Sequence, residues 1–409
     1  MWIDLIFLCS VGVAILVWAA LSIYMLVVQR RREATRASLQ AALEALAPLQ
    51  ATAAAERLAV ARPLLQGASR ELIMHGAAER DLPNHTFETL MAIIAERWSI
   101  DVLVRDASAH VSTRDKWRRT TAIALLARHG HAHAMTLVAR ALNDRDQDVA
   151  AAALAVLGRS HAPEAADLLV GALASPTVPA SRVALYIDQS PLDLRSRLVA
   201  LLEHGNPTVR QSAATLLARY PDDAAEDAIL PLVRDADPRV RKAAIQTLGR
   251  IGSDRTVPYA VSLLSDPMPF VRAHAARALG ELGRADLADR VASLLGDGDW
   301  WVRLAARESL EMMGSEVWPV LVRCLDHRDR FVRNGAAEVV QNLGVLDSLI
   351  MLEAASDNPA SAKVAMLQRI AAAGGVRFTE SLVERAGPVV GPRVRRLLDT
   401  IGLEHVGAA

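Results

Sequence analysis

The sequence predicts an all-α fold, an α-solenoid of about ten two-helix repeats preceded by one transmembrane helix. Three observations support this prediction. The hydrophobic residues make up 52% of the 409-residue chain and are mostly Ala, Leu and Val, whereas aromatic residues make up 4%, a composition typical of helices that pack through small side chains. A short motif returns with a period near 31 residues, and an uncharged stretch lies close to the first residue.

The uncharged stretch runs from Leu5 to Val28 and predicts a membrane anchor. A helix of 24 residues spans roughly 36 Å, which is enough to cross a bilayer. Arg30, Arg31 and Arg32 follow it, whereas Asp4 is the charged side chain before it, so we expect the N-terminus outside and the remainder in the cytoplasm. The alternative is a cleaved signal peptide, which the acidic start and the length of the apolar run disfavour.

The repeat motif has the form Asp-x-x-Val-Arg-x-x-Ala-x-x-x-Leu-Gly. Its valine recurs at positions 149, 209, 240, 271, 302 and 332, with one degenerate unit in the gap of 60. Fainter copies occur near residues 117, 363 and 394, which gives about ten units. Each unit has room for two helices that cannot bury an apolar face alone, so we expect neighbouring units to stack.

The motif positions have local reasons. Asp237 is expected to cap the second helix of its unit, and Pro238 suits the first helical position because its missing N–H is not needed there. Val240, Ala244 and Leu248 share one helix face, and the small alanine permits a close helix approach. Gly249 and Gly252 are predicted to end the helix.

This pattern resembles the HEAT-repeat family, and its period is most similar to that of the short HEAT-like repeats named after phycobilisome lyases. The resemblance covers roughly residues 110–402 and is strongest from 206 to 344. It implies a right-handed solenoid used as a protein-binding scaffold, with the second helices on the concave face. We therefore expect an anchor with its basic flank at 1–32, a helical cap region at 33–110 and the repeat solenoid at 111–409.

The arginine of the motif forms a ladder with two possible roles. Either it is a basic stripe for phosphates or acidic peptides, or each arginine pairs with a capping aspartate and keeps neighbouring repeats in register. We favour the structural role, because the acid recurs with the same period as the base. The predicted ladder residues are Asp237, Arg241, Asp299, Asp329 and Arg333.

Aromatic side chains gather just before the motif valine in three consecutive repeats. Phe270, Trp301 and Phe331 hold this slot, with Trp300 beside it, in a chain of only 16 aromatic residues. These rings either fill gaps between repeats or form a ridge that binds a protein partner, since large aromatic residues are frequent among binding hot spots. The predicted protein-binding residues are these four and Arg303.

Several other functions are disfavoured. The formal net charge is zero, which argues against a dedicated nucleic-acid binder. Cys9 and Cys324 suggest neither a disulfide framework nor a zinc site, and His129, His131 and His133 lack a nearby Cys or carboxylate to complete a metal site. Deoxyhypusine hydroxylase, which resembles this chain in repeat type, holds di-iron through His-Glu pairs, and none of the eleven histidines here is followed by Glu.

The sequence thus predicts a non-catalytic, single-pass membrane scaffold that binds a protein partner on a cytoplasmic solenoid. No cofactor, metal, nucleic acid or small-molecule substrate is expected. A neighbouring membrane enzyme or an envelope-assembly complex is the first partner class to test. The alternative is an enzyme or enzyme subunit of the lyase-like HEAT-repeat kind, which rests on fold analogy alone.

Overall fold

The computed structural model describes residues 36–79, 81–108, 116–355, 361–373, 378–379, 386–401 and 405–406, together with single positions between 18 and 34. The predicted anchor at 5–28 lies mostly outside these residues. Within the described part, no helix combines the length and the hydropathy needed to cross a membrane. The chain divides into two compact units, residues 1–193 and 194–409, which are described separately.

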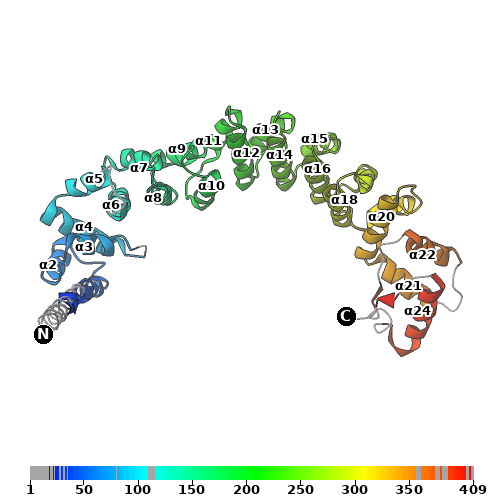
Figure 1. Cartoon of the computed structure of the whole chain (residues 1–409), viewed down its shortest axis with the longest axis horizontal. Coiled ribbons are helices and arrows are strands. Elements are labelled where there is room, and N and C mark those ends of the chain that lie inside the picture. The colour runs from blue at the N-terminus through cyan, green and yellow to red at the C-terminus, as the bar shows by residue number, and fades with distance from the viewer. Residues whose placement is uncertain are drawn as a thin grey trace, which may run out of the picture. The chain divides into compact units, whose positions relative to one another are not determined.

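The first unit is helical throughout its described residues (Figure 1). Residues 36–46 are helical, and the elements that follow are α2 (Ala54–Leu65), α3 (Arg70–Ala77), α4 (Asn84–Trp98), α5 (Asp101–Ser108), α6 (Lys116–His129), α7 (Ala134–Leu142), α8 (Gln147–Leu157), α9 (Pro163–Gly171), η1 (Ala172–Ala174) and α10 (Ala180–Gln189). The degenerate repeat predicted between residues 149 and 209 is the pair α9 and α10. Its second helix buries Val183 and Ile187.

The second unit is a stack of helix pairs. A 3₁₀ turn precedes or continues most of the helices that come first in their pair. These first helices are α11 (Arg195–Ala200) with η2 (Leu201–Glu203), α13 (Asp223–Ile229) with η4 (Leu230–Arg234), η5 (Asp254–Thr256) with α15 (Val257–Leu263), η6 (Ala285–Leu287) with α17 (Ala288–Ala292) and η7 (Ser293–Gly296), η8 (Gly314–Val317) with α19 (Trp318–Cys324), and α21 (Val345–Ala355).

The second helices of this unit pack one on the next. They are α12 (Pro207–Leu216) with η3 (Leu217–Arg219), α14 (Pro238–Ile251), α16 (Pro269–Glu281), α18 (Trp300–Met312), α20 (Arg330–Asn342), α22 (Ser361–Ala373) and α24 (Gly387–Ile401). Within this unit α12, α14, α16 and α18 follow the inner edge of the curve, and α13 and α15 follow the outer edge (Figure 1). The all-α solenoid prediction is therefore confirmed for the described repeats, with the second helices on the concave side of this unit.

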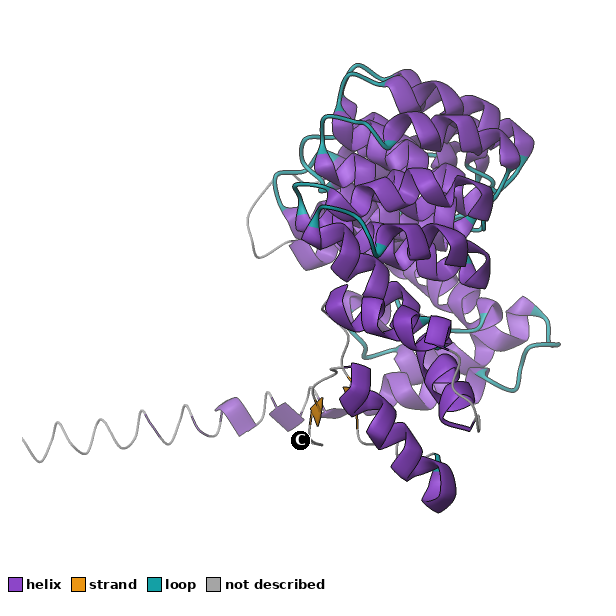
Figure 2. Cartoon of the chain, turned by 90° about the vertical axis from the view of Figure 1, so that its right-hand side faces the viewer, coloured by secondary structure: helices purple, strands orange, loops and turns teal. Residues whose placement is uncertain are grey.

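One feature departs from an all-α fold. Two short strands, β1 (Phe378–Thr379) and β2 (His405–Val406), pair in parallel near the C-terminus (Figure 2). Phe, Thr and Val are residues that favour extended backbone, which is the local reason for strands here. The helical periodicity of the repeats gave no sign of this pair.

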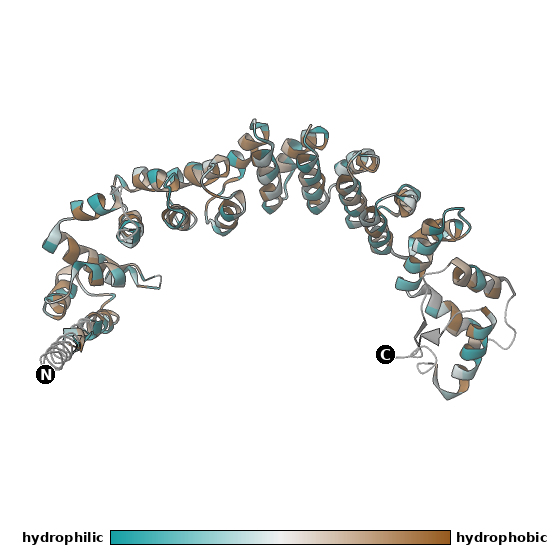
Figure 3. Ribbon diagram, in the orientation of Figure 1, coloured by the Kyte–Doolittle hydropathy of each residue, from teal (hydrophilic) through white to brown (hydrophobic). Residues whose placement is uncertain are grey.

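The core follows the predicted helix face. Val240, Ala244 and Leu248 are fully buried, and their counterparts in α18 are buried in the same way. Hydrophobic and hydrophilic residues are interspersed along the helices (Figure 3), as expected for helices with one buried and one solvated side. Each repeat thus buries its apolar stripe against its neighbours.

Capping residues fix where the second helices begin. The side chain of Asp237 accepts a hydrogen bond from Arg239 N at 2.8 Å, and Asp299 accepts from Trp301 N at 2.9 Å. Asp329 does the same for Phe331 N at 2.8 Å. Each bond satisfies a backbone donor that the first helical turn leaves unpaired. Met268 stands at the equivalent position before α16 and forms no side-chain cap.

The two glycines predicted to end α14 have different roles. Gly252 is the C-cap residue and adopts a left-handed φ of 80°. Gly249, in contrast, lies inside the helix, where a Cβ atom would come within 3.2 Å of the backbone of Ala278 in α16. The prediction for Gly249 is therefore corrected: it permits close packing of the next repeat, because the helix continues for two residues beyond it.

Candidate functional site

The ladder arginines use both edges of the guanidinium. Arg241 donates from Nη1 to the carbonyl oxygen of Asp235 at 2.9 Å, in the loop before its own helix. Its Nε and Nη2 atoms donate to the two carboxylate oxygens of Asp266 at 2.8 and 2.9 Å, in the next repeat. A planar fork of two hydrogen bonds is the strongest geometry available to an arginine and a carboxylate.

The same arrangement recurs in the neighbouring repeats. Arg210 binds Asp235, and Arg272 binds Asp297, both through Nε and Nη2 at 2.8 Å. In each case the carboxylate lies 25 residues after the arginine. In the first unit, Arg119 pairs with Asp144 at the same separation. Arg118, in the faint copy predicted near residue 117, pairs instead with Glu71 at 3.0 Å, so the ladder position of this copy is one residue later, at Arg119.

The sequence predicted that the ladder arginines pair with the capping aspartates, and this prediction is wrong. The acid of the ladder is the aspartate two residues before the cap, because the capping carboxylate already accepts from the first turn of its own helix. Asp235, for example, binds both Arg210 and the backbone N–H of Asp237. Burial alone raises the pKa of Asp235, but these hydrogen bonds outweigh it and hold the pKa below its usual value.

The ladder changes at the interface between α18 and α20. The loop position filled by Asp235, Asp266 and Asp297 in the preceding repeats holds His327 here. Its Nδ1 accepts from Asp329 N at 3.1 Å, in place of the carboxylate oxygen. The repeat is also one residue shorter, so the residue 25 positions after Arg303 is Arg328.

Arg303 therefore keeps one half of the ladder contacts. Its Nη1 donates to the carbonyl oxygens of Asp297 and Gly298 at 2.7 and 3.3 Å, as in the other repeats. Across the described residues, however, no carboxylate pairs with it. Its guanidinium instead lies over the ring of Phe331, 4.4 Å from the ring centre, which is a cation–π contact.

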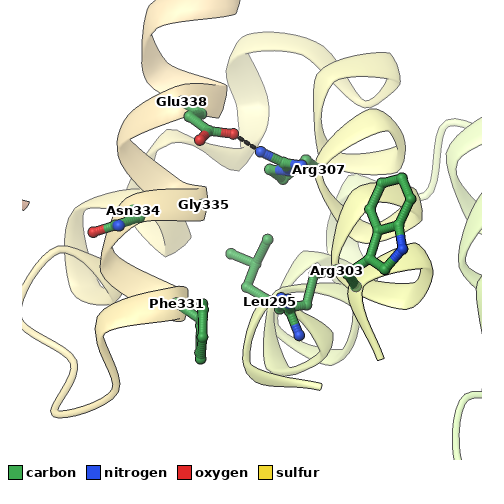
Figure 4. Close-up of a pocket in the computed structure, with 8 residues that line it drawn as sticks. Leu295, Arg303, Arg307, Phe331, Asn334, Gly335 and Glu338 are labelled. Atoms are coloured by element: carbon green, nitrogen blue, oxygen red, sulfur yellow. Dashed lines mark ion pairs between the residues drawn. The ribbon is translucent and has the colours of Figure 1, made fainter. Parts of the chain in front are cut away.

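A pocket of about 200 Å³ opens at this position (Figure 4). Its lining residues are Leu295, Trp300, Arg303, Arg307, Phe331, Asn334, Gly335 and Glu338. Figure 4 shows Phe331 across from Leu295 and Arg303, with the ion pair of Arg307 and Glu338 at the far side. The pocket therefore combines the apolar side chains of Leu295, Trp300 and Phe331 with an arginine whose carboxylate-binding edge meets no carboxylate among the described residues.

The predicted aromatic residues are not equivalent. Trp300 and Trp301 at the start of α18 are 51% and 55% exposed and stack with ring centres 3.9 Å apart. Phe331 at the start of α20 is 42% exposed. Phe270 is only half-buried and does not line the pocket. The structure thus brings Trp300, Phe331 and Arg303 together, while their role in binding stays a prediction.

Sequence reasoning missed four residues at or beside this site, two in the loop before α20 and two in an ion pair. In the preceding repeats an aspartate lies two residues before the cap, whereas His327 followed by Arg328 stands there before α20. The sequence shows this change once the ladder acid is assigned to that position. Arg307 and Glu338 form an additional ion pair between α18 and α20. Among the described residues, no group of three or more His, Cys, Asp or Glu side chains is placed to hold a metal ion.

Comparisons with known proteins support the repeat type. Residues 195–269 and 257–341 match the model of HEAT repeats, so this part of the chain consists of HEAT-like repeats. No curated protein shows significant similarity to the chain.

Solved structures with a similar fold include the karyopherin Kap121p bound to Pho4p, at 15% identity and a TM-score of 0.51; the match covers 90% of this chain and 47% of that one. The chain therefore spans about half of that karyopherin. The complex of CpcE and CpcF of phycocyanin lyase from Nostoc sp. PCC7120 matches at 23% identity and a TM-score of 0.32, over 52% of this chain and 96% of that chain. These likenesses concern the fold.

Proposed function

We propose that the chain is a membrane-anchored scaffold that binds a protein partner on the concave side of its HEAT-like repeats. The observation that carries this proposal is the exposure of Trp300, Trp301 and Phe331 beside a pocket between two second helices. Large rings beside a pocket are the usual anchors of protein interfaces. Stacked HEAT-like repeats are typical of scaffolds, and the similar karyopherin was solved with a bound protein.

The anchor is the second part of the proposal. Its support is the uncharged stretch from Leu5 to Val28 and the basic residues after it. The few described residues in this stretch include Trp18 and Tyr24, which are 71% and 64% exposed. Aromatic side chains exposed in this way are suited to lipid. The proposed topology has the N-terminus outside and the repeats in the cytoplasm, facing neighbours in the same membrane.

Photo-crosslinking in intact membranes tests the binding face. A photoreactive phenylalanine analogue replaces Trp301 in the full chain, and in a matched variant it replaces Ser262, an exposed residue of the first helix α15. We expect a discrete crosslinked protein from position 301 and none from position 262. Trp300→Ala is expected to lower the crosslinking yield at position 301 several-fold, because the indole of Trp300 beside it is part of the proposed binding surface. Equal crosslinking at both positions would refute the proposed face.

The enzyme alternative stays a prediction. The HEAT-repeat match identifies no reaction. Purified chain with a covalently bound chromophore would favour that alternative.

A further inference from the structure

The pocket between α18 and α20 contains an arginine oriented toward a carboxylate that no described residue of the chain supplies. In the three preceding repeats, Nε and Nη2 of the ladder arginine bind a carboxylate of the next repeat at 2.8 to 2.9 Å. In Arg303, Nη1 holds the same two loop carbonyl groups as its counterparts do. We call one arginine with the carboxylate that it binds in the next repeat a rung. The Nε and Nη2 edge of Arg303 is therefore oriented as in a complete rung, and His327 holds the position of the aspartate.

The start of the ladder differs from the position of Arg303, whereas Arg333 in the next repeat also donates from Nη1 to two loop carbonyl oxygens, of His327 and Arg328. His204 occupies the acid position before α12 and accepts from Asn206 N at 3.1 Å, just as His327 accepts from Asp329 N. The position 31 residues before Arg210, however, is Pro179, so the sequence there lacks the motif arginine as well as the acid. At the interface between α18 and α20 the motif arginine, Arg303, is present, and only the aspartate is replaced, by His327.

We propose that Arg303 binds an aspartate or glutamate side chain of the protein partner, which completes the ladder from another molecule. This inference rests on the proposed function, since it needs a protein partner on this face. The partner's carboxylate would accept two parallel hydrogen bonds from Nε and Nη2 of Arg303, in the plane of the guanidinium. Phe331, stacked on that plane, would contact the carbon atoms beside the carboxylate.

Charge and size both favour this occupant. Arg328 lies in the loop before α20 and Arg330 is the first residue of α20, where it also lies over Phe331, 4.9 Å from the ring centre. The acid among the lining residues, Glu338, is already paired with Arg307, and Asp329 caps α20. A volume of about 200 Å³ is below the ~300 Å³ at which small-molecule sites usually begin, and it suits one inserted side chain.

The decisive variant is His327→Asp, which returns the internal acid to its ladder position. We expect its carboxylate to accept from Asp329 N and to occupy the edge of Arg303, as Asp297 does for Arg272. The variant should therefore be more thermally stable than the parent and should lose the acid-binding site. A variant that merely failed to fold would show the opposite change in melting temperature, so the two outcomes are separable.

The probe is a random twelve-residue peptide library, selected against the full chain reconstituted in lipid nanodiscs. The His327→Asp chain in the same nanodiscs serves for counter-selection. We expect the enriched peptides to share an Asp or Glu at one position, next to an apolar residue. Replacing that acid by its amide, or Arg303 by Lys, should weaken binding about ten- to a hundredfold, the range for a lost hydrogen bond between charged groups. Arg272→Lys should leave peptide binding unchanged, because that rung is filled internally.

Three results would overturn the inference. The enriched peptides could lack a shared acid, they could bind the His327→Asp chain as well as the parent, or vesicles containing phosphatidylserine could bind through Arg303 while the peptides do not. The last result would assign the site to a lipid headgroup. If instead position 301 still crosslinks a discrete protein while His327→Asp changes nothing, the proposed function stands and the acid site falls.

Discussion

At the scale of single residues, the ladder arginine links one repeat to the next by hydrogen bonds on both edges of its guanidinium. Its Nη1 closes the loop before its own helix, and its other edge binds the following repeat. The carboxylates at these rungs are largely buried, with Asp266 only 4% exposed. Arginines whose second edge is occupied in this way do not form a free basic stripe for phosphates. The structural role predicted for Arg241 agrees with this geometry.

Removing one ladder arginine should destabilise the array. Arg241→Ala leaves the carboxylate of Asp266 buried without its partner, and we expect a loss of about 3 kcal/mol, the scale for breaking a buried ion pair from one side. Arg239→Ala is the matched control, since Arg239 lies exposed beside the capping Asp237 and its loss should leave the stability almost unchanged. Urea unfolding followed by circular dichroism measures both. Similar losses in the two variants would contradict the assigned role.

A second residue-scale prediction concerns His274 in α16. Burial, together with Lys242, Arg277 and Arg250, lowers the pKa of this imidazole from its usual value near 6.5 to about 4. Between these two values the unfolded chain binds a proton that the folded chain does not. The contribution of His274 to stability is therefore complete above pH 6.5 and is lost as the pH falls toward 4.

His274→Gln tests this directly, because glutamine does not titrate. In the parent chain the melting temperature should fall on acidification from pH 6.5 to 4, and in the variant that part of the decrease should be absent. Differential scanning fluorimetry at half-unit pH intervals measures the difference. His131→Gln, a change of a half-buried histidine between α6 and α7 of the first unit, serves as the control, and the decrease on acidification should persist in it.

At the scale of elements, the second helices approach closely wherever a glycine faces the next helix. A Cβ atom on Gly280 of α16 would lie 2.8 Å from Cα of Ser309 in α18, and one on Gly249 would meet α16 in the same manner. Distances this short require the backbone of the neighbouring helix to move. The close packing of α14, α16 and α18 thus depends on these glycines.

Gly280→Ala should therefore separate α16 from α18. We expect a loss of about 1 to 3 kcal/mol, the usual cost of overpacking, although alanine favours a helix more than glycine does. Gly298→Ala is the control, because a Cβ there has no heavy atom within 4 Å. Hydrogen exchange should show faster exchange in α16 and α18 of the first variant alone. An unchanged Gly280→Ala protein would show that the helices can shift apart without cost.

The same scale shows what the sequence could and could not predict. Periodicity located the repeats and the caps, since Asp237 and Pro238 act on their own helix and need no knowledge of the neighbour. The partner of Arg241 was assigned to a capping aspartate wrongly, because aspartates two residues apart carry the same period and the period alone does not distinguish them. The role of Gly249 was missed because its contact is with α16 and not with its own turn.

At the scale of the whole molecule, stacked repeats couple mainly to their neighbours. Every complete rung links one repeat to the next, and the interface between α18 and α20 lacks that link among the described residues. Arg303 and its pocket therefore lie at the interface where the pair of arginine and carboxylate is missing among the described residues. This is the place at which a partner can add stability, because it supplies the missing carboxylate. The proposed anchor would hold this surface near the membrane, where partners that share the membrane are concentrated.

The last prediction concerns the proposed anchor and is tested with the full-length chain. Ala14→Arg combined with Val17→Arg places two charges in the middle of the apolar stretch, each costing about 2.5 to 3.5 kcal/mol at the centre of a membrane helix. We expect the parent chain to stay with the membrane fraction after an alkaline carbonate wash and the double variant to be released. Ala14→Leu with Val17→Leu keeps the hydropathy and should remain with the membrane. Release of the parent chain by the same wash would refute the anchor, and it would leave the repeats and the Arg303 pocket to act without one.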